Sequence, residues 1–205
     1  MNITKLHKSN PSYPVNLQTY LGDDTPEFIT VLGDLSILQN KSLALFCSVK
    51  CPGTLILKTY DLAQQLRQAG VTVIGGFHSP IEREFLEILL RGSQPIIICP
   101  ARSIEGMRIP NTWRLPMNEG RLLILSPFDL KHHRITTELG TKRNEFVAAI
   151  ADQIFVAHAT SGGKTEQFCQ KVISWGKTLL TFDCKENTHL IDMGAGIVQF
   201  EDILK

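Results

Sequence analysis

"QIFVAHATSGGKTEQF", residues 153–168, joins an apolar run to a turn of small residues and then to a helix-like run. This order is typical of a buried strand that ends at a ligand-binding turn. Gly163-Lys164-Thr165 resembles the end of a nucleotide-binding P-loop, but the full motif needs a glycine five residues before Gly163, where the chain has His158. The stretch therefore predicts a strand, a turn and a helix. The turn either has the wrong length for phosphate or binds it in another way.

Apolar runs of the same kind recur along the chain and alternate with helix-length segments. Several are apolar at nearly every position, as expected of strands covered on both faces. Strands are predicted within residues 27–34, 43–49, 71–77, 95–99, 121–126, 153–158, 177–183 and 196–200, and helices within 54–70, 79–92, 141–152 and 164–176. The alternation predicts a doubly wound, Rossmann-like α/β fold, with a mostly parallel sheet and helices on both faces.

The first forty residues differ from this regular pattern. They carry Pro11, Pro14 and Pro26 and a single strand-like run. We expect residues 1–40 to form a small N-terminal segment that packs on a core domain of residues 41–205. Residues 100–120 are rich in proline and glycine and are expected to leave the regular alternation as an excursion.

Composition narrows the classes of protein that the chain can represent. Of its 205 residues 43% are hydrophobic, and the net charge is +1, so no global field attracts it to nucleic acid or membrane. Five cysteines without a CxxC pair favour free thiols in a reducing compartment. No apolar run is long enough for a signal core or a membrane span. We expect a cytoplasmic protein that is not bound to a membrane and has no metal or other cofactor.

Small or polar residues stand where the predicted strands end and helices begin. Gly75 and Gly76 end one strand, Arg143-Asn144 are predicted to open a helix, and Ser161 to Thr165, with Gly162, Gly163 and Lys164, form the quoted turn. In doubly wound sheets these ends meet at one edge, where helix N-termini bind phosphate. They are therefore candidate phosphate ligands. The alternatives are an ordinary turn at 161–165, helix–sheet packing at the glycines, and a solvated first turn at Arg143.

The order of these motifs resembles that of a known family. The chain carries Tyr13-Pro14, "GDLSILQNKSLALFCSV" at 33–49, "QAGVTVIGGFHSPIEREF" at 68–85, "RNEFVAAIAD" at 143–152 and "IFVAHATSGGKTEQF" at 154–168. In order and spacing they resemble the DNA-processing protein A (DprA/Smf) family over about residues 9–200. That family belongs to a wider superfamily with the cytokinin-activating LOG proteins. The resemblance implies a Rossmann-like core.

Two loops depart from the family pattern. Where the family reads Gly-Ser-Arg, this chain reads Cys47-Ser48-Val49, so the resemblance adds only Ser48 to the candidate ligands. Where the family has Arg and Asp, the chain reads Ser79-Pro80-Ile81-Glu82. These changes put the family's ligand pocket in this chain in question.

The resemblance implies a protein that binds single-stranded DNA and assists recombination or DNA uptake, as a homo-oligomer that presents DNA to a recombinase. The alternatives are a nucleotide-derivative binding protein or LOG-like nucleotide hydrolase, and a degenerate paralogue that binds only a protein partner. No catalytic residue is assigned, which favours a binding protein over an enzyme. Glu166 lies in a compressed version of the LOG loop, and we expect a solvent-facing helix residue.

Three further expectations concern charge. Lys164 and Arg143 are predicted to be exposed and to reach one phosphate. The cluster Lys131-His132-His133-Arg134, with Arg108, Trp113 and Arg114, is either a path for a nucleic-acid backbone, with the indole as a stacking surface, or a solvated loop. His78 and His158 stand at strand ends and either face the pocket or have a structural role.

Overall fold

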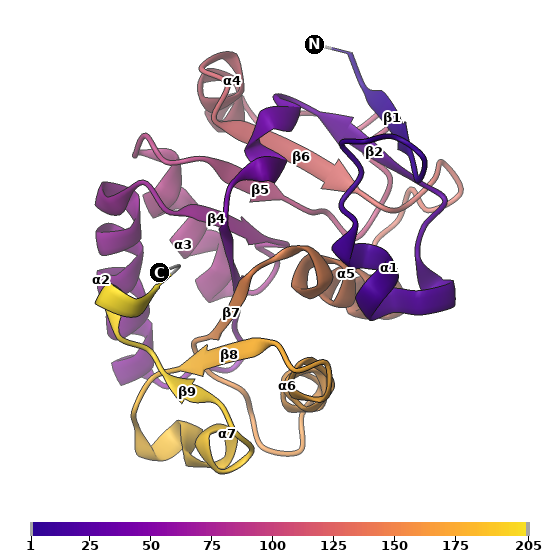
Figure 1. Cartoon of the computed structure of the whole chain (residues 1–205). Helices are drawn as coiled ribbons and strands as arrows, with labels where there is room; N and C mark the ends of the chain where they lie inside the picture. The colour runs from indigo at the N-terminus through magenta and orange to yellow at the C-terminus, as the bar shows by residue number, and fades with distance from the viewer. Residues whose placement is uncertain (1, 204–205) are drawn as a thin grey trace.

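A computed structural model describes residues 2–203, and nine strands in this part of the chain form one sheet (Figure 1). Along the sheet the order is β1-β2-β6-β5-β4-β3-β7-β8-β9. The strands are β1 (Thr4–His7), β2 (Phe28–Leu32), β3 (Ser42–Phe46), β4 (Thr72–Gly75), β5 (Ile96–Ile98), β6 (Leu122–Ser126), β7 (Gln153–Val156), β8 (Thr178–Thr181) and β9 (Gly196–Ile197). From β6 to β9 all neighbours are parallel, so the predicted mostly parallel sheet is confirmed.

The order of the strands defines where a ligand is expected. From β3 the chain winds outward through β4, β5 and β6, and it then returns to place β7 on the other side of β3. The direction of winding therefore reverses between β3 and β7. In open α/β sheets, ligands bind beyond the carboxyl ends of the strands at such a reversal.

Helices cover both faces of the sheet, as predicted (Figure 1). One core contains α2 (Gly53–Ala69), α3 (Pro80–Leu90) and α4 (Asn111–Asn118). The other contains α1 (Asn16–Leu21), α5 (Thr137–Ile150), α6 (Lys164–Ser174) and α7 (Thr188–Asp192). Alternate strand residues enter the two cores, as the period of two in a strand requires: Leu43 and Leu45 pack against α2, whereas Ala44 and Phe46 face the other way.

The N-terminal residues extend the sheet with antiparallel strands. β1 pairs antiparallel with β2, and β2 pairs antiparallel with β6. The helix α1 packs on α5. The short elements β1, α1, α4 and α7 were not predicted from the sequence. Whether residues 1–40 form a unit separate from residues 41–205 stays a prediction.

Local signals explain several helix ends, and one predicted start is wrong. Ser79 and Glu82 form the predicted capping box of α3, and α2 ends at Gly70, whose φ is 72°. In contrast, α5 begins one turn earlier than residue 141, because Thr136 caps it by accepting a hydrogen bond from the Leu139 N–H at 3.2 Å.

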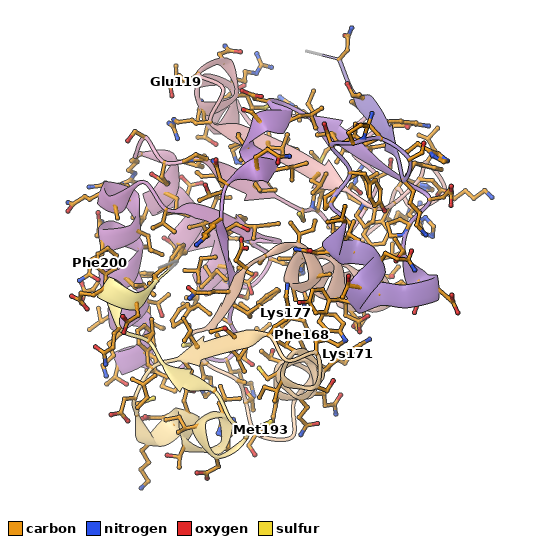
Figure 2. The ribbon with its side chains drawn as sticks, in the orientation of Figure 1. Glu119, Phe168, Lys171, Lys177, Met193 and Phe200 are labelled. Atoms are coloured by element: carbon orange, nitrogen blue, oxygen red, sulfur yellow. The ribbon has the colours of Figure 1, made fainter. Side chains whose placement is uncertain are left out.

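Lys177 closes the other end of α5. Its Nζ donates to the carbonyls of Ala148 at 2.6 Å, Ala149 at 3.1 Å and Ala151 at 2.5 Å, and lies 4.3 Å from the centre of the Tyr20 ring. Figure 2 shows Lys177 between β8 and α5. A lysine that satisfies the last carbonyls of a helix complements its dipole. This contact connects the start of β8 to α5 and α1.

In residues 2–203 no helix is both long and apolar enough to cross a membrane.

The five cysteines are all free thiols. Burial raises the pKa of Cys99 and of Cys169 to about 12 and also raises that of Cys47. These thiols are therefore neutral in the folded protein under conditions where an unfolded chain ionises them.

The buried thiols predict a loss of stability at alkaline pH. Because the folded-state pKa of Cys99 and Cys169 lies above the unfolded value of 9.0, the contribution of each neutral thiol is fully present below pH 9 and is lost as the pH rises towards 12. The loss is roughly 1.4 kcal/mol per pH unit for each thiol. Lys177 acts in the opposite direction, because burial lowers its pKa to about 8.

We expect urea unfolding in reducing buffer to show a free energy that falls above pH 9. Cys99→Ala removes one of the buried thiols, so the free energy of unfolding of this variant should fall less steeply with pH than that of the wild type. Parallel pH profiles for the two proteins would contradict the role of Cys99.

Candidate functional site

A cleft of about 850 Å³ opens at the carboxyl ends of the central strands. Its lining comes from the loops after β3, β4 and β5, from the first half of α5 and from the first two turns of α6. Four predicted ligands meet there: Arg143 and Asn144 from α5, and Lys164 and Thr165 from α6. The cleft thus lies beside the reversal of the sheet and is the candidate site.

Ser48 joins the two strands at the reversal. Its N–H donates to the His158 carbonyl at 2.9 Å, and its Oγ accepts from the Thr160 N–H at 3.0 Å. Ser48 is buried and does not line the cleft, although its neighbours Cys47 and Val49 do. In the structure it fixes the loops after β3 and β7 relative to each other, and a direct contact with ligand stays a prediction.

Arg143 is buried, which corrects the prediction of an exposed residue that opens a helix. Arg143 lies in the second turn of α5 and is only 5% exposed. Its Nε donates to Asn144 Oδ1 at 2.8 Å, and its Nη1 donates to the Cys99 carbonyl at 3.1 Å. Arg143 is in phase with the buried residues Leu139 and Phe146, so it lies on the buried face of α5. A prediction that began the helix one turn earlier would have placed it there.

Gly76 makes room for this arginine. A Cβ at position 76 would lie 1.3 Å from Nη1 and 1.8 Å from Cζ of Arg143. At Gly75 a Cβ would meet the Phe77 ring at 3.2 Å. Both glycines therefore have a packing role, because side-chain atoms of Arg143 and Phe77 approach them closely, and a contact with ligand stays a prediction.

The charge of Arg143 has no counter-ion at contact distance. Among residues 2–203 no carboxylate lies within 4.0 Å of the guanidinium, and the Nη2 donors make no hydrogen bond. Burial lowers the pKa of Arg143, and the more distant carboxylate of Glu82 opposes this effect. Arginine nevertheless stays protonated in proteins. The result is a buried cation at the wall of an open cleft.

Glu82 organises the wall opposite α5. Its Oε1 accepts from the Cys47 N–H at 3.0 Å, and its Oε2 accepts from the N–H groups of His78 at 2.7 Å and Ser79 at 3.3 Å. Phe77, directly before His78, has a φ of 48°, which is unusual for a bulky residue. The sequence indicated only the helix cap. Here the carboxylate also connects the loops after β3 and β4.

The quoted turn uses some of its own amides. The N–H of Gly162, where φ is 71°, donates to Glu166 Oε2 at 2.7 Å, and that of Gly163 donates to the Thr160 carbonyl at 2.9 Å. These two N–H groups are therefore not available to a phosphate in this conformation. Ser161 and Gly162 are exposed and lie outside the cleft lining. Their predicted contact with phosphate is untested.

The expectation that Glu166 faces solvent is wrong. Its side chain is 13% exposed, and Oε1 lies 3.5 Å from His189 Nε2. It holds the turn in place and is absent from the cleft lining. Lys164, in contrast, is exposed as predicted, lines the cleft and has no hydrogen bond or ion pair within residues 2–203.

The other basic and histidine candidates have separate positions. Buried His158 bonds Asn187 Oδ1 through Nδ1 at 2.9 Å, which is a structural role, whereas exposed His78 lines the cleft. Lys131 to Arg134 are exposed and are absent from the cleft lining, and a contact of theirs with DNA stays a prediction. Trp113 is half-buried and packs against the core of α2 and α3, and its role as a stacking surface stays a prediction.

Lys171 is a cleft residue that sequence reasoning missed. It stands seven positions after Lys164, and helical spacing places both on one face of α6. Figure 2 shows Phe168 and Lys171 on α6. This spacing was the available signal. Lys171 pairs with Glu145 of α5 at 2.8 Å, so the two walls of the cleft are joined by an ion pair.

Comparison with known proteins identifies the family. The model of a family described as DNA recombination-mediator protein A matches residues 4–205. The chain belongs to this family. The DprA/Smf resemblance seen in the sequence is therefore confirmed. No curated protein matches the chain.

Solved structures of DNA processing protein A have the same fold. The protein from Streptococcus pneumoniae is 17% identical, with a TM-score of 0.82 over 100% of this chain and 74% of its own. The protein from Helicobacter pylori, whose structure describes a single-stranded DNA binding mode, is 17% identical, with a TM-score of 0.77 over 98% of this chain and 93% of its own.

A molybdenum cofactor carrier protein from Chlamydomonas reinhardtii also shares the core architecture. It is 11% identical, with a TM-score of 0.53 over 78% of this chain and 91% of its own. At such identities the likeness shows the fold alone. The fold is thus common to the recombination-mediator family and to proteins of another function.

Proposed function

We propose that this protein binds single-stranded DNA and that one phosphate of the strand enters the cleft at Arg143. The observation that carries the proposal is the buried guanidinium without a counter-ion at the cleft wall. Burying a charge without a partner is costly. A phosphate would supply the missing negative charge, and arginine donates to phosphate in pairs of charge-assisted hydrogen bonds.

Lys164 would add a second positive charge to the same phosphate or its neighbour. It is exposed and unpaired within the described residues, and it begins α6, whose N-terminus favours anions. Lys171 contributes less, because Glu145 already neutralises it. A net charge of +1 for the whole chain is compatible with this arrangement, since the attraction is local.

The depth of Arg143 favours single strands over duplex. Because its residue is only 5% exposed, a phosphate must enter the cleft to contact its guanidinium. A flexible single strand can bend its backbone into a recess. Duplex DNA is stiff over the length of such a site, and its phosphates lie on a wide cylinder. We therefore expect weaker binding of duplex.

Membership in the recombination-mediator family, and the single-stranded DNA binding described for the Helicobacter pylori protein, support the proposal. Assembly into a homo-oligomer, delivery of DNA to a recombinase and a cytoplasmic location are parts of it. A nucleotide derivative is the second candidate ligand, because about 850 Å³ is also the size of a small-molecule pocket.

Fluorescence anisotropy tests the proposal with labelled oligo-dT and a duplex of equal length at low and moderate salt. We expect tighter binding of the single strand and a loss of affinity with salt. Lys164→Ala should weaken binding about ten-fold and lower the salt slope by roughly 0.7. Lys41→Ala, an exposed lysine before β3 at the opposite end of the sheet, is the control. Equal affinity for single-stranded and duplex DNA, or no binding of either form at low salt, would refute the proposed function.

A further inference from the structure

Two exposed aliphatic side chains stand among the polar and charged residues that line the cleft. Val49, from the loop after β3, is 72% exposed, and Ile135, from the loop before α5, is 53% exposed. Both line the cleft. Most large hydrophobic residues of this protein are buried in the two cores. Because both side chains line the cleft, a ligand that enters it can cover them and remove their apolar surface from water.

Both side chains are held by fixed neighbours. Val49 follows Ser48, which bonds the His158 carbonyl and the Thr160 N–H. Ile135 precedes Thr136, which caps α5 through the Leu139 N–H. The two loops follow β3 and β6, which lie three steps apart in the sheet, or about 14 Å at the usual strand spacing. The loops that carry the two aliphatic side chains are therefore held in place without a ligand, and they follow different strands of the sheet.

The combination selects a ligand with an anionic part and an apolar part. Arg143 and Lys164 attract the anion, whereas Val49 and Ile135 can only contribute van der Waals and hydrophobic contact. Inorganic phosphate, polyphosphate and acidic protein surfaces have the charge without a flat apolar body. A nucleotide unit has both, because every base presents an apolar face beside its phosphate.

We propose that the nucleobases of the bound strand lie against Val49 and Ile135 while its phosphate meets Arg143. This inference rests on the proposed function and adds a base contact to it. Aliphatic side chains offer no hydrogen-bond pattern, so the contact is independent of base identity. Val49 stands at the position where the family motif reads arginine, so this chain has an apolar side chain there instead of a charged one.

The test compares oligo-dT with an abasic oligomer of equal length and charge. Val49→Ser and Ile135→Ser should each weaken binding of oligo-dT about three- to ten-fold and leave binding of the abasic oligomer unchanged. Lys164→Ala should weaken both. Val15→Ser, at an exposed valine before α1, is the matched control. Thermal midpoints should stay unchanged, because the substituted side chains are exposed.

The outcomes separate this inference from the proposed function. Wild-type protein that binds both oligomers equally, or serine variants that lose affinity for both, would overturn the base contact and leave DNA binding standing. Binding of neither oligomer by the wild type would refute the proposed function and the base contact together.

Discussion

Arg143→Met should abolish binding of single-stranded DNA and still leave a folded protein. The guanidinium is expected to make two charge-assisted hydrogen bonds to phosphate, each worth roughly 1.5–3 kcal/mol. Their loss corresponds to an affinity at least about 100-fold lower. Within residues 2–203 no other cation of the cleft lining is buried, because Lys164 and Lys171 are both exposed.

The stability of the free protein should change little, for two opposing reasons. Methionine removes the bonds to the Cys99 carbonyl and to Asn144, at a cost of about 1–3 kcal/mol. It also removes a buried charge that has no carboxylate within 4.0 Å, which relieves a penalty of similar or larger size. We expect the free energy of unfolding to stay within about 1 kcal/mol of the wild type.

Urea unfolding and fluorescence anisotropy on the same variant measure both effects. Arg143→Lys is the informative companion, because it keeps the charge but loses the planar fork and should recover only part of the affinity. Full affinity in Arg143→Met would remove this residue from the site. Strong destabilisation by Arg143→Met would mean that the arginine is a structural residue.

Gly76→Ala should weaken DNA binding through Arg143, although position 76 need not contact DNA. The new Cβ would occupy the space of the guanidinium, 1.3 Å from Nη1, so the arginine must leave the Cys99 carbonyl and turn towards solvent. A displaced guanidinium loses the geometry that a phosphate requires. We expect an affinity about ten-fold lower or more, from the loss of one charge-assisted bond.

A double-mutant cycle distinguishes this mechanism from a direct contact. If Gly76 acts through Arg143, adding Gly76→Ala to Arg143→Met should cause no further loss of affinity. Gly53→Ala is the matched control, because a Cβ there meets no atom within 4 Å. Additive losses in the double variant would show that Gly76 contacts the ligand independently.

The alternation of apolar runs and helix-length segments was sufficient to predict the seven strands from β3 to β9 and the helices α2, α3, α5 and α6. These elements depend on local periodicity and on caps such as Ser79 and Glu82, which are written in adjacent residues. The short elements β1 and α1 could not be predicted from local patterns, because β1 is stabilised by pairing with β2 and α1 by packing on α5.

The sequence alone also assigned the chain to its family and placed Lys164, Arg143 and the loop after β3 at one end of the sheet. That placement follows from topology, because parallel strands end at a common edge. The motif alone did not reveal that Ser48 ties β3 to β7 or that Glu166 holds the turn.

The burial of Arg143 and the task of Gly76 were decided by contacts between distant segments. Residues 76 and 99 directly follow β4 and β5, and residue 143 lies in α5, so no local pattern predicts that the guanidinium will lie against a glycine at the end of a strand. One helical turn at the start of α5 decides whether Arg143 faces water or the sheet. The exposed Val49 and Ile135 likewise become candidate ligand contacts only because the fold brings their loops to the same cleft. Close packing between elements, rather than propensity within them, therefore shapes the site.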